Sequence, residues 1–254
     1  MIHETLELNG AKLEFALWTG TRSGRLPILL MHEGLGSVGL WKNFPEALAE
    51  ATGREVIAWS RQGHGWSDRI SETRQPDYMH REAELLPALH RQLGLLRAHW
   101  LGHSDGGSIA LIGASWYPEL AASLILEAPH VFVEDVTVSS IAAIGASYAA
   151  SGMGKRMQHY HADPDHIFRK WNDIWLEPAF RDWNIEVLLP QIRAPALLIQ
   201  GRDDEYGTME QLDRIAAMLP AIQRLELDAC GHSPHRDRAA AVIAAICDFL
   251  EHKD

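Results

Sequence analysis

The stretch HWLGHSDGGSIAL, residues 99–111, decides the fold of this 254-residue chain. An apolar run of strand character ends in it, Gly102-His103-Ser104-Asp105-Gly106 follows, and a helical pattern begins directly afterwards. This is the only G-x-S-x-G in the chain. A sharp turn from a strand into a helix strains the residue at its tip, and flanking glycines let the two elements approach closely. The turn would aim the Ser104 hydroxyl out of the sheet, in front of the free N–H groups of the helix. The pattern therefore predicts a nucleophilic serine.

Short apolar runs alternate with helical patterns along most of the chain. Buried strands are predicted at 26–32, 55–60, 98–103, 121–128, 194–201 and 223–229, and helices at 45–52, 80–94, 209–219 and 238–252. This alternation is typical of an α/β fold with a mostly parallel sheet and helices on both faces. The opening ETLELNGAKLEFALW predicts an antiparallel hairpin that turns at Asn9-Gly10.

One long segment breaks the alternation. No strand-like run occurs between the strand that ends near residue 128 and the one that starts near residue 194. A connection of that length is rarely without structure, so we expect residues 131–191 to form a helical cap. Residues 1–130 and 192–254 would then form the core domain. The cap carries an aromatic cluster: Tyr148, Tyr160, Phe168, Trp171, Trp175, Phe180 and Trp183.

A serine nucleophile needs a base, and the base needs a carboxylate to orient it. ALLIQGRDDEYGT ends a strand and then places Asp203 and Asp204 after Gly201, and LDACGHSPHRD ends the last strand with His232. The order Ser, Asp, His, each just past a strand, fits a catalytic triad, although position alone does not choose between the two acids. LLMHEGLGS follows the first parallel strand, and its loop could turn an N–H group toward the site. The second donor to an oxyanion would be the N–H of Asp105.

These motifs together carry a resemblance to a known family. With HEGLG, SRQGHGWSD, GHSDGG, GRDDEYG and CGHSPH, the chain resembles an α/β-hydrolase over nearly its whole length. The resemblance implies Asp204 as the acid and Gly34 as an oxyanion-hole donor, and it makes the RQGHGWSD segment structural. Two residues depart from the family pattern: Glu33 stands where the oxyanion loop commonly has Gly, and Ser60 stands where an Asp is usual. Glu33 would put a carboxylate near a site that must stabilise negative charge.

With a serine at the turn, the chain resembles the esterase, lactonase, thioesterase and carbon–carbon hydrolase branches of the family. We expect a serine hydrolase of carboxylic esters with small to medium, mostly apolar substrates. Hydrolysis of a carbon–carbon bond in a vinylogous 1,5-diketone, lactone hydrolysis and a small-molecule receptor on the same fold stay open. The side chains expected at the substrate are Glu33, His103, Trp171 and Trp175. The two tryptophans share a helix face and could equally serve only to pack the cap.

The bulk composition limits the partners. The net charge is −11, which argues against nucleic acid and an anionic membrane surface, and no apolar run reaches the length of a membrane span. The chain has two cysteines, which make no disulfide framework, and its N-terminus lacks signal-peptide character. We therefore expect a cytoplasmic protein that acts on a small molecule without a cofactor or a metal. The sequence does not indicate an oligomeric state.

Overall fold

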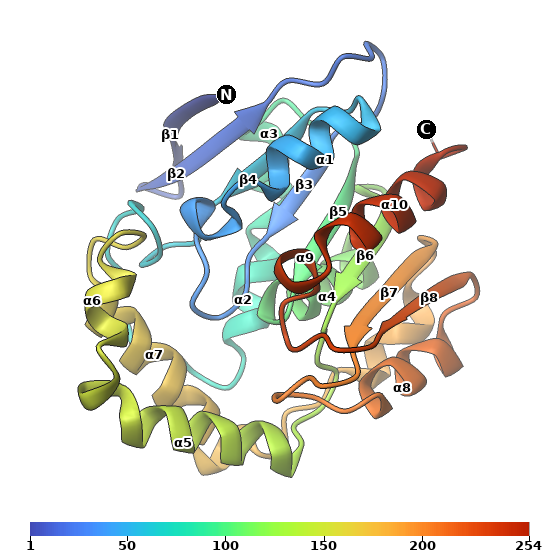
Figure 1. The fold of residues 1–254 in the computed structure, drawn as a ribbon. Coiled ribbons are helices and arrows are strands. Elements are labelled where there is room, and N and C mark those ends of the chain that lie inside the picture. The colour runs from blue at the N-terminus through green and yellow to red at the C-terminus, as the bar shows by residue number, and fades with distance from the viewer. Residues whose placement is uncertain (254) are drawn as a thin grey trace.

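The computed structural model describes residues 1–253 and contains one eight-stranded sheet (Figure 1). The strand order is β1-β2-β4-β3-β5-β6-β7-β8, and only the pairs β1–β2 and β2–β4 are antiparallel. The strands are β1 (Ile2–Leu8), β2 (Ala11–Trp18), β3 (Ile28–Met31), β4 (Val56–Trp59), β5 (Ala98–His103), β6 (Ala121–Glu127), β7 (Ala196–Gly201) and β8 (Ile222–Leu227). Each of the six predicted buried strands overlaps one of β3 to β8.

Helices cover both faces of the sheet because successive side chains of a strand point to opposite sides. Leu29 and Met31 pack into one apolar cluster, and Ile28 and Leu30 pack into another. α1 (Phe44–Thr52) and α10 (Ala239–Leu250) cover the second cluster, and α2 (Tyr78–Glu84), α4 (Asp105–Trp116) and α8 (Glu210–Met218) cover the first. The predicted fold class, a mostly parallel sheet between two helical layers, is confirmed.

The hairpin prediction at the N-terminus is also confirmed. β1 and β2 pair along their whole length, and the turn residues Asn9 and Gly10 have φ of 51° and 82°. Positive φ at both positions is the geometry of a type I′ turn, which matches the twist of the flanking strands.

The predicted single helix over 80–94 is wrong. The segment forms two helices, α2 and α3 (Leu86–Gln92), which meet at Leu85. Pro87 lies in the first turn of α3, and a proline there cannot donate the N–H that would continue α2. The helix predicted over 238–252 is α10, and a separate short helix, α9 (Pro234–Asp237), precedes it.

The segment predicted to be a cap is helical. It contains α5 (Asp135–Ser151), α6 (Met153–Met157), α7 (Pro164–Leu176) and two 3-10 helices, η2 (Pro178–Phe180) and η3 (Glu186–Gln191). Its one β pairing within residues 1–253 is an isolated bridge between Phe132 and Asn184. In Figure 1, α5, α6 and α7 lie together at the lower left, away from α1 and α10. Its boundary as a domain separate from residues 1–130 and 192–254 stays a prediction.

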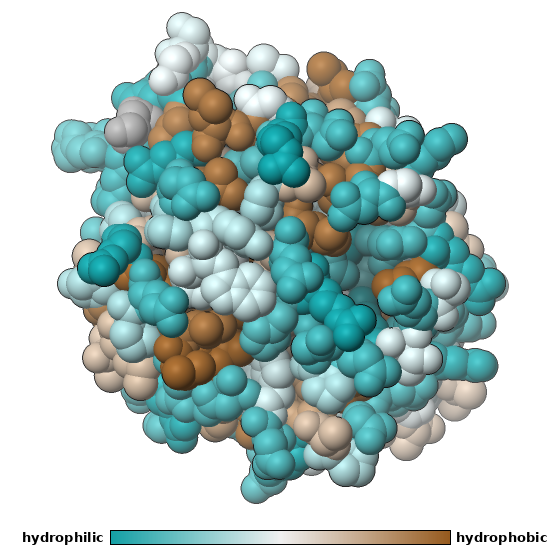
Figure 2. Space-filling model, turned by 180° about the vertical axis from the view of Figure 1, so that it is seen from behind, coloured by the Kyte–Doolittle hydropathy of each residue, from teal (hydrophilic) through white to brown (hydrophobic). Residues whose placement is uncertain are grey.

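The surface is mixed. In Figure 2 most of the visible face is hydrophilic, and the brown apolar groups are separated by teal ones. Within residues 1–253, no helix has both the length and the apolar character that crossing a membrane requires.

Candidate active site

Ser104 occupies a strained turn between β5 and α4. Its φ of 53° and ψ of −117° lie where L-residues are rarely found. The flanking glycines are required by backbone contacts: a Cβ on Gly102 would lie 2.3 Å from the carbonyl oxygen of Gly106, and one on Gly106 would lie 2.0 Å from that of Met31. The Ser104 hydroxyl makes no capping bond to α4, so it is free for another partner.

The structure brings Ser104, His232 and Asp204 into one hydrogen-bonded chain. His232 Nε2 lies 2.9 Å from Ser104 Oγ, and His232 Nδ1 lies 2.9 Å and 3.0 Å from the two carboxylate oxygens of Asp204. Ser104 and the Asp204 side chain are buried, while 12% of the His232 side chain is exposed. This geometry allows His232 to take the proton of Ser104 while Asp204 holds the opposite ring nitrogen.

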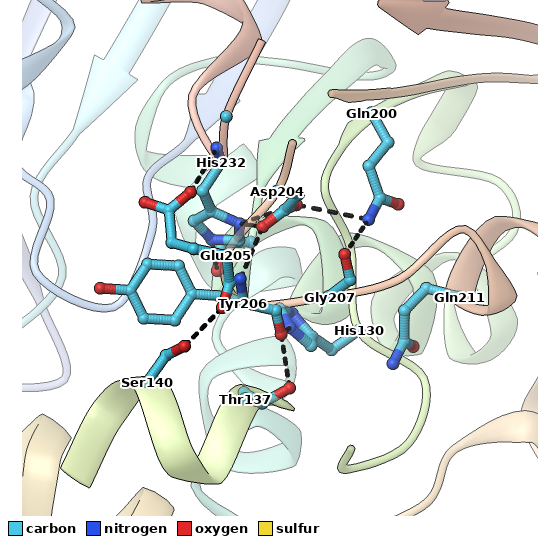
Figure 3. Close-up of polar contacts among 12 residues, drawn as sticks. His130, Thr137, Ser140, Gln200, Asp204, Glu205, Tyr206, Gly207, Gln211 and His232 are labelled. Carbon is cyan, nitrogen blue, oxygen red and sulfur yellow. Dashed lines mark hydrogen bonds and ion pairs between the residues drawn. The ribbon is translucent and has the colours of Figure 1, made fainter. Parts of the chain in front are cut away.

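The loop that carries Asp204 fixes this carboxylate with further donors (Figure 3). The N–H of Tyr206 donates to one oxygen at 2.8 Å, and Gln200 Nε2 donates to the other at 3.3 Å. Burial opposes ionisation of Asp204, but the facing His232 and the N–H of Tyr206 outweigh it and hold the pKa of the carboxyl below its usual range. Asp203, the alternative acid, is exposed and does not bond to His232 within the described residues.

Side chains from other segments form hydrogen bonds with the carbonyl groups of the loop after β3. The guanidinium of Arg61, which is buried, donates to the carbonyls of His32 and Glu33 at 2.5 Å and 2.9 Å. His64 Nε2 lies 3.1 Å from the carbonyl oxygen of Gly34, and His161 Nε2 lies 2.9 Å from that of Leu35. These contacts fix the orientation of the peptide groups in the loop.

Two backbone N–H groups next to Ser104 stay available. The N–H of Gly34 donates to no group in the described part of the chain, and the N–H of Asp105 lies at the free N-terminus of α4. Asp105 itself is held by Tyr78, whose hydroxyl donates to Asp105 Oδ2 at 2.8 Å. Both N–H groups belong to the positions predicted for the oxyanion hole.

A cavity of about 240 Å³ opens onto Ser104 and His232. Its walls include all four residues predicted at the substrate, Glu33, His103, Trp171 and Trp175. Apolar side chains of the cap segment supply much of the rest, namely Ile141, Ile144, Met153 and Met157. Trp171 and Trp175 also belong to the main apolar cluster, so they pack the cap segment and line the cavity at once.

Several residues of the cavity were not predicted from the sequence: His130, Glu205, Tyr206, Ser233 and Arg236. His130 follows the end of β6 by three residues, so the rule that found Asp204 and His232 could have found it. Its Nε2 lies 3.1 Å from the carbonyl oxygen of Tyr206, and burial together with repulsion from His232 lowers its pKa. Burial and the neighbouring acids Glu205 and Asp204 raise the pKa of Tyr206 to about 12.

Comparison with known proteins identifies the family. The model of the alpha/beta hydrolase family matches residues 28–245. The chain belongs to this family.

Relatives of known name differ in their reactions. A 2-hydroxy-6-oxononadienedioate/2-hydroxy-6-oxononatrienedioate hydrolase of Paraburkholderia phymatum is 28% identical, over 92% of this chain and 90% of its own. A proline iminopeptidase of Lactobacillus helveticus is 26% identical over 92% of this chain and 93% of its own. The crystal structure of a 2-hydroxy-6-oxo-6-phenylhexa-2,4-dienoate hydrolase from Rhodococcus sp. superposes with a TM-score of 0.83 at 17% identity and covers 98% of both chains. The family and the fold are therefore shared, and the relatives act on different substrates.

Proposed function

We propose that this hydrolase cleaves carboxylic esters of small to medium, mostly apolar substrates. The observation that carries the proposal is the 2.9 Å contact between His232 Nε2 and Ser104 Oγ at the foot of the cavity, with Asp204 on the other ring nitrogen. Ser104 would be the nucleophile, His232 the general base and Asp204 the residue that orients it. Gly34 and Asp105 would supply the oxyanion hole.

The reaction follows from these roles. His232 takes the proton of Ser104 as Oγ attacks the ester carbonyl carbon, and the carbonyl oxygen becomes an oxyanion held by the N–H groups of Gly34 and Asp105. The tetrahedral intermediate collapses, His232 protonates the leaving alcohol, and the acyl group stays on Ser104. Water, deprotonated by His232, then attacks the acyl-enzyme and releases the acid. Asp204 stabilises the imidazolium in both halves of the reaction.

The cavity wall supports an apolar substrate. Isoleucine, methionine and tryptophan side chains of the cap segment line the cavity that opens onto Ser104, and burial of apolar surface would supply most of the binding energy. The ionisable side chains in the wall are Glu33, Glu205, Arg236 and the histidines of the site. Glu33 faces His103, and Glu205 shares the wall with Arg236, so the wall has no excess of positive charge to bind a carboxylate and favours a substrate without one.

Hydrolysis of a carbon–carbon bond is the second candidate. It is favoured by the relative of Paraburkholderia phymatum, whose name describes the hydrolysis of a dienedioate. The same triad could serve that reaction, but a dienedioate carries two carboxylates, and the cavity wall holds one arginine, Arg236, to bind them. Lactone hydrolysis needs no change in the site. A receptor without catalysis would not need the Ser104–His232–Asp204 contacts.

The test is a panel of 4-nitrophenyl esters of graded acyl length, with a lactone and a dienoic 1,5-diketone measured beside them. We expect turnover of the short and medium esters and its loss in Ser104→Ala. Rapid turnover of the diketone with none of the esters would replace the first candidate by the second. An organophosphonate should form its adduct on Ser104, and an adduct on another serine would refute the proposed nucleophile.

A further inference from the structure

His103, the residue before the serine, touches the other two loops of the site. Its side chain is 1% exposed, and its Nε2 lies 2.6 Å from the carbonyl oxygen of His232. Its Nδ1 lies 3.6 Å from Glu33 Oε2. The imidazole of His103, at the end of β5, thus contacts both the oxyanion loop after β3 and the loop after β8 that carries His232.

The contacts of His103 determine which ring nitrogens carry protons. A carbonyl oxygen only accepts, so Nε2 must donate to His232. If Nδ1 carried no proton, its lone pair would face the carboxylate of Glu33, which is unfavourable. A proton on Nδ1 removes this repulsion and turns the pair into an imidazolium facing a carboxylate. The two charges then compensate each other inside the site.

We propose that His103 and Glu33 form a positioning pair that holds the His232 loop against the oxyanion loop. This inference rests on the proposed hydrolysis through Ser104. The hydrogen bond from His103 fixes the backbone of His232, and the backbone fixes where its ring meets Ser104. Glu33, which no role in the triad explains, keeps His103 protonated and in place. The carboxylate in the oxyanion loop therefore acts on His103 and does not weaken the oxyanion hole.

Other charged and titratable groups face His103 from each neighbouring element. They are Glu33 from the loop after β3, Glu127 from the end of β6, and His232 and His235 from the loop and helix after β8. Glu127 already bonds to His235 Nδ1 at 2.6 Å, which leaves Glu33 as the acid that directly faces His103. Burial opposes the charged form, but Glu33 and Glu127 outweigh it and raise the pKa of His103. Burial likewise opposes ionisation of Glu33, while His103 holds the pKa of this carboxyl well below its usual range.

The experiment measures how fast an alkyl 4-nitrophenyl phosphonate phosphonylates Ser104, followed by release of 4-nitrophenolate. This step needs Ser104 and His232 but not the natural substrate. His103→Leu removes the donor to His232, and we expect its rate to fall by about 30- to 100-fold, because a displacement near 1 Å in a catalytic site can cost about two orders of magnitude. His103→Gln keeps a donor of similar reach and should recover most of that loss. His90→Gln is the matched control, because His90 is also buried but accepts a hydrogen bond from Trp100 Nε1 and does not line the cavity.

The charge of the pair is tested by the pH dependence of the same rate. In His103→Gln the carboxylate of Glu33 loses its counter-charge, and an uncompensated negative charge near His232 favours the protonated, inactive base. The acid limb of the rate profile should therefore move to higher pH by about half a unit to one unit. In the double variant His103→Gln/Glu33→Gln both charges are gone, and the limb should return to the position of the unmodified protein. A structural role of His103 alone would not depend on Glu33 in this way.

The outcomes separate this inference from the proposed function. No phosphonylation of Ser104 in the unmodified protein would refute the proposed function. Normal phosphonylation there, with His103→Leu within twofold of it at every pH, would overturn the positioning pair alone. An acid limb that stays shifted in the double variant would also overturn it. If His103→Leu does not fold, the comparison of His103→Gln with the double variant decides the question.

Discussion

Gly106→Ala tests whether the approach of α4 to β3 sets the geometry of the site. The new Cβ would lie 2.0 Å from the carbonyl oxygen of Met31 and 2.7 Å from that of His32. Both are backbone atoms in or directly after a central strand, so neither can rotate away. Ordinary contacts of this kind begin at about 3.4 Å, so α4 and β3 must separate by about 1.4 Å. That shift moves Ser104 and the Asp105 N–H relative to Gly34.

The expected effects follow from this displacement. A shift of about 1 Å in a catalytic constellation costs about 100-fold in rate, so ester hydrolysis or phosphonylation should fall by about that factor. Overpacking of this kind also costs about 1–3 kcal/mol, which corresponds to a melting temperature lower by about 2–12 °C in a chain of this size.

Gly107→Ala is the matched control on the next residue. Its Cβ would lie 3.0 Å from the side chain of Pro129 and 3.3 Å from the carbonyl oxygen of Gly102, so a movement of a few tenths of an ångström suffices. Alanine also favours the helix over glycine by about 1 kcal/mol, which offsets part of the crowding. We expect activity within about threefold of the unmodified protein, because the change does not separate α4 from β3. Equal activity and equal thermal stability of the two variants would refute the argument from close packing.

Three further predictions concern the acid and the cavity. Asp204→Asn should lower turnover by about four orders of magnitude with an unchanged circular dichroism spectrum, and Asp203→Asn should change it little; the reverse order would show that the acid is assigned one residue too late. Burial raises the pKa of Asp204, but His232 outweighs burial and lowers it. The ionised carboxylate therefore stabilises the folded state at pH values above the usual carboxyl range, and this stability is lost as the pH falls through the lowered pKa. The melting temperature of Asp204→Asn should therefore fall less steeply with acidification than that of the unmodified protein, and parallel curves would contradict this. Trp175→Ala should move the preferred acyl chain to greater length and spare acetate, whereas an equal loss on all esters with a lower melting temperature would indicate a packing role alone.

Much of the site could be predicted because its parts follow the ends of strands. Buried strands are visible as runs of Val, Ile and Leu, and the carboxyl ends of parallel strands meet at one edge of the sheet. Ser104, His232 and the pair Asp203-Asp204 each follow such a run, so their meeting follows from topology. The choice of Asp204 required the family spacing, because neighbouring side chains past a strand diverge and the sequence does not say which one faces inward.

The sequence did not predict the contacts that hold the loop after β3. The carbonyl of Glu33 is bonded by Arg61, 28 residues away, and that of Leu35 by His161, 126 residues away. Hydrophobic periodicity reports which face of an element is buried, and it carries no information about such long-range polar partners. The split of the helix at Pro87, unlike these long-range contacts, could have been predicted, because a proline within a helical pattern signals a boundary.

Ser60 is explained by a residue that no local pattern connects to it. The family usually has an aspartate at this position, and here the Ser60 hydroxyl donates at 2.6 Å to Glu14 and accepts the N–H of Val38 at 2.9 Å. Glu14 comes from β2, is buried, and also accepts the N–H of Trp66 at 3.1 Å. Glu14 of the neighbouring strand β2 thus supplies the carboxylate that an aspartate at position 60 would carry, and a carboxylate stays at this place in the fold.

The cap segment contacts the loops that carry Leu35 and Asp204 as well as the cavity. His161 bonds to the oxyanion loop at Leu35, and at the start of α5 the hydroxyl of Thr137 donates to the carbonyl of Tyr206, two residues past Asp204. Figure 3 shows Thr137 and Ser140 on the same helix reaching the loop that carries Asp204. Because these bonds end on the backbone of both loops, the position of the cap and the geometry around Ser104 are coupled. A substitution in the cap that breaks them should lower the rate on every ester, whereas one that only reshapes the cavity wall should change the preference among esters.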